Sequence, residues 1–173
     1  DGTIIEDPPD EQVDSLQKLR LLPGVIPALL ELQRAGYRLV LVSNQDGLGT
    51  PSFPEPSFRE PQDFLRDLLA SQGTLFDAEF FCPHFPADDC ECRKPKAALV
   101  EQYLAATQID LARSAVIGDR VTDMQFAGNL GVRGLRVVKD GTSVETWPAV
   151  GRELLSRRAH IERRTKETDI RID

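Results

Sequence analysis

The stretch that decides the fold class is Arg38-Leu39-Val40-Leu41-Val42-Ser43, which runs directly into Asn44-Gln45-Asp46-Gly47. A near-continuous apolar run of this length is typical of a strand that is covered on both faces of a sheet. A helix is predicted just before it, over residues 25–35, because leucines form an apolar stripe that stops at Gly36. Helix followed by buried strand is the repeating unit of an α/β protein.

The same alternation continues toward the carboxyl end. Helices are predicted over residues 63–72, 96–107 and 122–130, and strands over residues 79–82, 114–117 and 134–138. In the first of these helices we expect the core to be contacted by Phe64, Leu65, Leu68 and Leu69. Strands that alternate with helices of this length pair in parallel, so we expect a doubly wound, mostly parallel sheet with helices on both faces.

Composition narrows the function classes. The chain has 173 residues, of which 40% are hydrophobic, enough for one well-packed domain. A formal charge of −7 argues against a general nucleic-acid binder. No apolar run is long enough to span a membrane, and no signal segment is visible. Thiols that belong to no disulfide framework favour a reducing, cytoplasmic location.

All three cysteines and one histidine lie in one short run, as Cys82, His84, Cys90 and Cys92. Thiolate and imidazole are the ligands of tetrahedral Zn²⁺, and two closely spaced pairs can face one ion. A disulfide between two of the cysteines, or burial of all three as small apolar side chains, is the alternative. A four-ligand site leaves no open position, so we expect structural zinc that fixes the following Arg93 and Lys94.

Polar residues stand at the ends of the predicted strands. Ser43 ends one strand, Asp119 follows another, and Lys94 follows the cysteine run. Asp1-Gly2-Thr3 would stand at the end of a strand just upstream. Parallel sheets bind ligands at the carboxyl ends of their strands, although serine and aspartate also favour turns and helix caps.

These groups suit phosphate chemistry. Carboxylates at Asp1 and Asp119 could hold Mg²⁺, while Ser43 and Lys94 could bind the oxygens of a phosphoryl group. The reaction class that fits is phosphate ester hydrolysis, in which one carboxylate attacks phosphorus and a second carboxylic acid protonates the leaving alcohol.

Four motifs carry a family resemblance. In order they are Asp1-Gly2-Thr3, Val42-Ser43-Asn44, Arg93-Lys94-Pro95 and Gly118-Asp119-Arg120-Val121-Thr122-Asp123. As a set they resemble the haloacid dehalogenase superfamily of phosphatases, and the cysteine run resembles the branch that contains histidinol-phosphate and heptose bisphosphate phosphatases. Asn44-Gln45-Asp46-Gly47-Leu48-Gly49-Thr50 looks most like the histidinol-phosphate enzymes.

The resemblance implies a role for each matching residue. Asp1 matches the general acid/base, whose carbonyl also binds Mg²⁺, and Asp119 matches the other Mg²⁺ ligand. Ser43 and Lys94 match the phosphate-binding hydroxyl and ammonium. The nucleophilic aspartate would lie two residues before Asp1, on a strand that we expect the intact protein to contain, so residues 1–173 alone should be inactive.

Other residues admit two interpretations. Asp123 could support the metal through water or could stabilise the first turn of a helix. Arg93 could contact substrate phosphate, which we favour, or hold the zinc loop, and Asn44 could bond substrate or cap a turn. Packing is the default for Phe53, Phe58 and Trp147, and we expect His160 to be solvated.

The resemblance implies Mg²⁺-dependent hydrolysis of L-histidinol phosphate to L-histidinol and phosphate, a step in histidine biosynthesis. Heptose bisphosphate phosphatase is the enzymatic alternative, and a non-catalytic zinc-stabilised module is the alternative from another class. No long cap insertion is visible, so the site should be open. Histidinol is cationic, and we expect the carboxylates of Asp46 or Glu55 to favour it.

The carboxyl end resembles a second family. Residues 163–170 are similar to the opening strand of imidazoleglycerol-phosphate dehydratase, although a polar tail that happens to alternate is the other interpretation. We therefore expect a phosphatase domain over residues 1–160. Residues 161–173 would be a linker and the start of a truncated second domain, with a dehydratase domain fused behind it. The expected partner is a small phosphorylated metabolite, with no nucleic acid and no membrane.

Overall fold

The computed structural model describes residues 1–137, 146–156, 161–164 and 169–172. The strands in the centre of the molecule pair in parallel. Strand β1 (Val40–Asn44) pairs with β2 (Ala78–Cys82), and β3 (Ala115–Gly118) pairs with β4 (Arg133–Arg136). Each predicted strand is present within about two residues of its expected bounds, except that Val138 lies outside the described residues.

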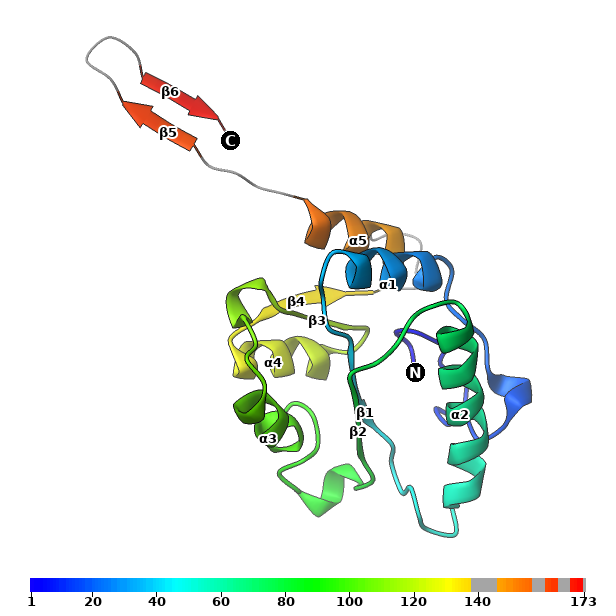
Figure 1. Cartoon of the computed structure of the whole chain (residues 1–173). Helices are drawn as coiled ribbons and strands as arrows, with labels where there is room; N and C mark the ends of the chain where they lie inside the picture. The colour runs from blue at the N-terminus through cyan, green and yellow to red at the C-terminus, as the bar shows by residue number, and fades with distance from the viewer. Residues whose placement is uncertain (138–145, 157–160, 165–168, 173) are drawn as a thin grey trace.

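The helices separate the strands in sequence and surround them in space. They are α1 (Val25–Arg34), α2 (Glu55–Ser71), α3 (Ala98–Ala106), α4 (Val121–Leu130) and α5 (Trp147–Leu155), with short 3-10 turns at Leu16–Lys18, Pro86–Asp88 and Leu111–Arg113. Helix α4 packs on β3 and β4, α3 packs on β2, and α1 lies along α5. Figure 1 shows α3 and α4 on one side of the strands and α2 on the other, which confirms the expected α/β class.

Helix α2 differs from its prediction. It begins at Glu55 and not near residue 63, and it continues through Pro61, which is buried. Pro56 stands in its first turn, where the missing N–H costs nothing because first-turn N–H groups have no partner within a helix. Leu65 and Leu69, which were predicted to face the core, are buried. The same prediction for Phe64 was wrong, because its side chain is 49% exposed.

Strand β1 also differs from its prediction. Each of its five residues is half-buried, whereas full cover on both faces was expected. Among the described residues, β1 has one partner strand, β2, and β3 has one partner strand, β4. Residues of both β1 and β3 line a cavity of about 1200 Å³, so solvent-accessible space reaches these strands.

The amino-terminal segment is attached to the core beside this cavity. The N–H of Leu22 donates to the carbonyl of Ile4 at 2.9 Å, and the N–H of Glu6 donates to the carbonyl of Arg20 at 2.7 Å. Ile4 is buried in the apolar cluster formed by α1 and α5. Residues 1–3 therefore leave a fixed backbone and lie near the carboxyl ends of the strands.

The carboxyl-terminal residues form a hairpin. Strand β5 (Ile161–Arg164) pairs antiparallel with β6 (Asp169–Ile172). The expected boundary at residue 160 falls outside the described residues, as does His160, so the two-domain division stays a prediction. Among the described residues, no helix has the length and apolar character required to cross a membrane.

Candidate active site

The amino-terminal motif is held by residues far along the chain. The Thr3 hydroxyl donates to Oδ1 of Asp119 at 3.0 Å, and the indole N–H of Trp147 donates to the Thr3 carbonyl at 2.6 Å. Gly2 has φ +69°, and a Cβ there would lie 2.1 Å from Oδ2 of Asp119. Only glycine therefore allows the Asp119 carboxylate to approach the backbone of this motif.

Ser43 and Asp1 share one hydrogen-bond donor. The side-chain amide of Gln45 donates to the Ser43 hydroxyl at 2.8 Å and to Oδ2 of Asp1 at 3.2 Å. Ser43 and Gln45 face the same way because they are two positions apart at the end of a strand. Gln45 is buried, with 7% of its surface exposed. It stands in the stretch 44–50 that resembles the histidinol-phosphate enzymes, but no role of its own was assigned to it from the sequence.

Lys94 is fixed by both its side chain and its backbone. Its ammonium donates to Oδ1 of Asp123 at 2.7 Å and to the Val42 carbonyl at 2.9 Å. The Asn44 amide accepts from the Lys94 N–H at 3.0 Å and donates to the Lys94 carbonyl at 3.2 Å. Asn44 thus positions the lysine in this structure, and its expected contact with substrate stays a prediction.

Asp123 has two partners, one for each oxygen. Its Oδ2 accepts from the Arg120 N–H at 3.0 Å, which caps the first turn of α4, while Oδ1 accepts from Lys94. Of the two interpretations of Asp123, the contact with the first turn of the helix is present, while support of the metal stays a prediction. The ion pair with Lys94 was missed, because 29 positions separate the two charges. At Gly118, a Cβ would lie 2.3 Å from the Cβ of Asp123, so the close approach again requires glycine.

One cavity brings the predicted groups together. Its lining includes all seven residues expected to act on substrate or magnesium: Asp1, Ser43, Asn44, Arg93, Lys94, Asp119 and Asp123. Carboxylate and carbonyl oxygens are ligands of Mg²⁺, so the Asp119 carboxylate and the backbone carbonyl of Asp1 fit this ion. Asp119, seated against Gly2, also has the backbone of the first motif beside it. One cation, one hydroxyl and two carboxylates can therefore meet around a phosphate.

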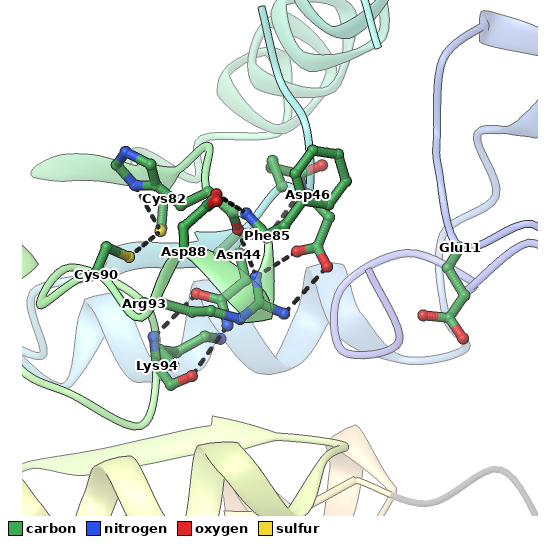
Figure 2. A network of polar contacts seen from close by, with 12 residues as sticks. Glu11, Asn44, Asp46, Cys82, Phe85, Asp88, Cys90, Arg93 and Lys94 are labelled. Carbon is green, nitrogen blue, oxygen red and sulfur yellow. Dashed lines mark hydrogen bonds and ion pairs between the residues drawn. The ribbon is translucent and has the colours of Figure 1, made fainter. Parts of the chain in front are cut away.

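Arg93 joins the cysteine run to the loop after β1. Its guanidinium forms a two-pronged ion pair with the Asp46 carboxylate, with one N–H···O distance of 3.1 Å, and donates to the His84 carbonyl at 2.8 Å. Figure 2 shows Arg93 lying between Asp46 and the segment that carries Phe85. These contacts hold the loop, while the substrate contact that we favoured stays a prediction.

The expectation that acidic groups stand ready for a cationic substrate needs correction. Asp46 is neutralised by Arg93, and Glu55 forms an ion pair with Arg59 one helical turn away. A carboxylate already paired with a guanidinium attracts a second cation weakly. The two ion pairs therefore weaken the charge-based preference for histidinol that these residues were expected to give.

The four expected zinc ligands cluster. The ligand atoms of Cys82, His84, Cys90 and Cys92 all lie within 4.8 Å of one another. The Sγ–Sγ distances are 3.2, 3.4 and 3.6 Å, and Nδ1 of His84 lies 3.1 and 3.6 Å from two of the sulfurs. Zinc bonds of about 2.3 Å to sulfur and about 2.0 Å to nitrogen place tetrahedral ligands roughly 3.5–3.8 Å apart.

The alternatives to a metal site are weakened by the same geometry. All three cysteines are free, so the disulfide interpretation was wrong, and only Cys82 is buried. Burial raises the pKa of the Cys82 thiol to about 12. A bound cation would offset that burial and keep the sulfur ionised, so the donor set and its surroundings fit Zn²⁺.

Aromatic side chains connect the loop after β1 to α2 and β2. Phe53 is 1% exposed and packs edge-on against Phe58, which packs in turn against Phe81 of β2. Trp147 is buried as well. The packing expected for Phe53 and Trp147 is confirmed, but the indole hydrogen bond to the first motif was not foreseen.

Comparison with known proteins agrees with this geometry. A family model for haloacid dehalogenase-like hydrolases matches residues 1–131. The histidine biosynthesis bifunctional protein HisB of Legionella pneumophila (strain Lens) is 51% identical over 172 residues, which cover 98% of this chain and 48% of that protein. Its counterpart in Xylella fastidiosa (strain M23) is 48% identical, covering 100% and 47%. The chain thus spans about half the length of these curated relatives.

A solved structure is also similar. The D,D-heptose 1,7-bisphosphate phosphatase from B. bronchiseptica, crystallised with magnesium and phosphate, is 31% identical with a TM-score of 0.78. The match covers 90% of this chain and 94% of that one. From its motifs, its α/β architecture and the family model that spans most of its length, this chain belongs to the haloacid dehalogenase-like hydrolases.

Proposed function

We propose that this chain is a phosphatase domain that hydrolyses L-histidinol phosphate to L-histidinol and phosphate, a step in histidine biosynthesis. The observation that carries the reaction class is the single cavity that Asp1, Ser43, Lys94 and Asp119 line together. The substrate follows from relatives that are about 50% identical and whose name places them in histidine biosynthesis.

Each residue has a defined task in this reaction. The Lys94 ammonium and the Ser43 hydroxyl bind phosphoryl oxygens, and Lys94 is held in place by Asp123. In its acid form, Asp1 gives a proton to the oxygen of the departing histidinol as the P–O bond breaks. Asp1 as its base form then takes a proton from the water that attacks phosphorus in the second step. Magnesium held by the Asp1 carbonyl and the Asp119 carboxylate would supply positive charge for the phosphate oxygens.

The nucleophile in this proposal is an aspartate two positions before Asp1. Its carboxylate attacks phosphorus and forms an aspartyl-phosphate, from which water releases phosphate. We infer that the strand carrying it enters the cavity between β1 and β3, since residues of both strands line that space. A strand there would join the two pairs β1–β2 and β3–β4 into one parallel sheet.

The cysteine cluster has a structural task. Zinc on Cys82, His84, Cys90 and Cys92 would fix the segment that leads into Lys94, while Arg93 ties it to the loop after β1. Four protein ligands leave no position for substrate. The metal therefore contributes to the geometry of the phosphate site and not to bond making.

The relatives also suggest a second domain. They are bifunctional by name and about twice as long as this chain. Together with the dehydratase-like sequence at residues 163–170, this supports a fusion in which the phosphatase domain ends near residue 160 and a dehydratase domain follows.

Heptose bisphosphate hydrolysis is the second candidate, because the structure from B. bronchiseptica carries that name at 31% identity. The test is kcat/KM for the two phosphates, measured side by side with the polypeptide that contains residues 1–173 and the proposed upstream strand. We expect the higher value for L-histidinol phosphate. A preference for the heptose substrate would reject our choice of substrate. Asn or Ala two positions before Asp1, with no hydrolysis of either, would favour the non-catalytic module.

A further inference from the structure

Gln45 lies where no motif of the family resemblance assigns a role, yet it contacts two of the groups proposed to act on phosphate. Its side-chain nitrogen lies 2.8 Å from the Ser43 hydroxyl and 3.2 Å from Oδ2 of Asp1. We propose that Gln45 is a positioning residue that orients Ser43 and Asp1 for the reaction, an inference that rests on the proposed phosphatase function.

The direction of these hydrogen bonds follows from chemistry. An ionised carboxylate can only accept, so the face of the Gln45 amide next to Asp1 must be its NH₂ group. The reverse orientation would place two oxygens against each other. The NH₂ group has two protons, and the two contacts use both of them. Gln45 therefore donates to Ser43 as well as to Asp1.

Donation to Ser43 has a consequence for phosphate binding. A hydroxyl that accepts from Gln45 keeps its own proton, which is then available for a phosphoryl oxygen. Without Gln45, the Ser43 hydroxyl would be free to rotate and donate elsewhere. The amide thus selects the hydroxyl orientation that suits an anionic ligand.

Donation to Asp1 has a consequence for proton transfer. Because Oδ2 already accepts from Gln45, the proton of the acid form belongs on Oδ1. The proton then has one defined position, Oδ1, whereas a carboxyl without the Gln45 contact would offer two equivalent oxygens. A fixed proton position suits an acid that must protonate one leaving oxygen.

Gln45 is rigid enough for this task. Its side chain is buried, its backbone N–H donates to the Cys82 carbonyl at 2.7 Å, and its carbonyl accepts from the Leu48 N–H at 3.1 Å. The anchor at Cys82 is the residue that supplies the first zinc ligand. A side chain that leaves a backbone fixed on both sides loses little freedom when it forms two hydrogen bonds.

The test compares Gln45→Leu with wild type on two phosphate esters, each protein carrying the proposed upstream strand. L-histidinol phosphate needs a proton on its alkoxide leaving group, whereas p-nitrophenyl phosphate releases a stable phenolate and does not. We expect kcat/KM to fall about 100-fold for the first ester and about tenfold or less for the second. Gln45→Met, of similar length and without an NH₂ group, should behave in the same way.

Gln33→Leu is the matched control. The Gln33 amide also makes two hydrogen bonds, to the backbone of Gly73 and Leu75, but its side chain does not line the cavity. It should leave the ratio of the two kcat/KM values unchanged. An equal fall on both esters in the Gln45 variants, or a fall of less than about twofold, would overturn the proposal.

A second measurement separates this proposal from the proposed function. In the NMR spectrum, the two side-chain N–H protons of Gln45 should respond separately, one to Ser43→Ala and the other to Asp1→Ala, while those of Gln33 stay in place. This result is expected even if wild type hydrolyses neither ester, which would reject the proposed function alone. Unmoved Gln45 signals in both variants would overturn the positioning role.

Discussion

The ion pair between Lys94 and Asp123 provides a test of the site that does not depend on turnover. The two side chains are 15% and 6% exposed, and their N–O distance is 2.7 Å. Asp123→Asn removes the charge but keeps an oxygen that can accept from the Arg120 N–H, which is the cap contact of α4. The substitution therefore isolates the ion pair from the helix cap.

The expected cost can be worked out from these contacts. After the substitution, the Lys94 ammonium keeps the Val42 carbonyl at 2.9 Å as its partner but has lost the compensating charge. Breaking a buried ion pair on one side costs about 3–5 kcal/mol. Because Lys94 keeps some contact with solvent, we expect the lower end, about 3 kcal/mol of unfolding free energy.

The assay is urea unfolding of wild type, Asp123→Asn, Lys94→Met and the double variant, with zinc bound and no added magnesium. In the double variant no unpaired ammonium remains, so its loss should be smaller than the sum of the single losses by about 1.5 kcal/mol or more. Asp110→Asn is the control, because Asp110 caps a 3-10 turn through the Ala112 N–H and is exposed. Additive losses at Lys94 and Asp123, within about 0.5 kcal/mol, would refute the reasoning.

Three further predictions follow from the geometry. Chelation of zinc should raise hydrogen exchange in residues 82–94 and leave α1 protected, and unchanged protection after complete removal would contradict the structural role of the metal. Gly2→Ala should destabilise the protein more than Gly36→Ala, since both have positive φ but only Gly2 meets another residue, at 2.1 Å, and equal losses by thermal unfolding would count against that contact. Arg93→Lys should raise hydrogen exchange in the loop after β1 nearly as much as Arg93→Ala, because lysine cannot make the two-pronged pair with Asp46, and full protection in the lysine variant would show that charge alone suffices.

The sequence predicted the elements of the site better than the connections between them. Strand ends at Ser43 and Asp119 follow from apolar runs that stop at polar residues, and parallel strands bring such ends to one edge. The zinc cluster was predictable because its ligands are neighbours in the chain. Helix α2 was placed too late because Pro61 is a strong helix breaker by propensity, and tertiary packing of a buried proline outweighed it.

The connections could not be predicted because they join residues that no local pattern relates. The pairs Lys94–Asp123 and Arg93–Asp46 span 29 and 47 positions, and each depends on the packed backbone. The charge-based preference expected from Asp46 overlooked this ion pair for the same reason. Asp46 is acidic in the sequence, but its partner is visible only in the fold.

The two hydrogen bonds that hold Thr3 can form only late in the synthesis of the chain. Its hydroxyl binds a residue 116 positions later, and its carbonyl binds an indole 144 positions later. At about 5–20 residues per second, a ribosome needs roughly 7 to 30 s to deliver the second partner. During that interval the first motif has been made but lacks its indole partner. A translation product that ends between these two partners would therefore carry the first motif with only one of its two long-range hydrogen bonds.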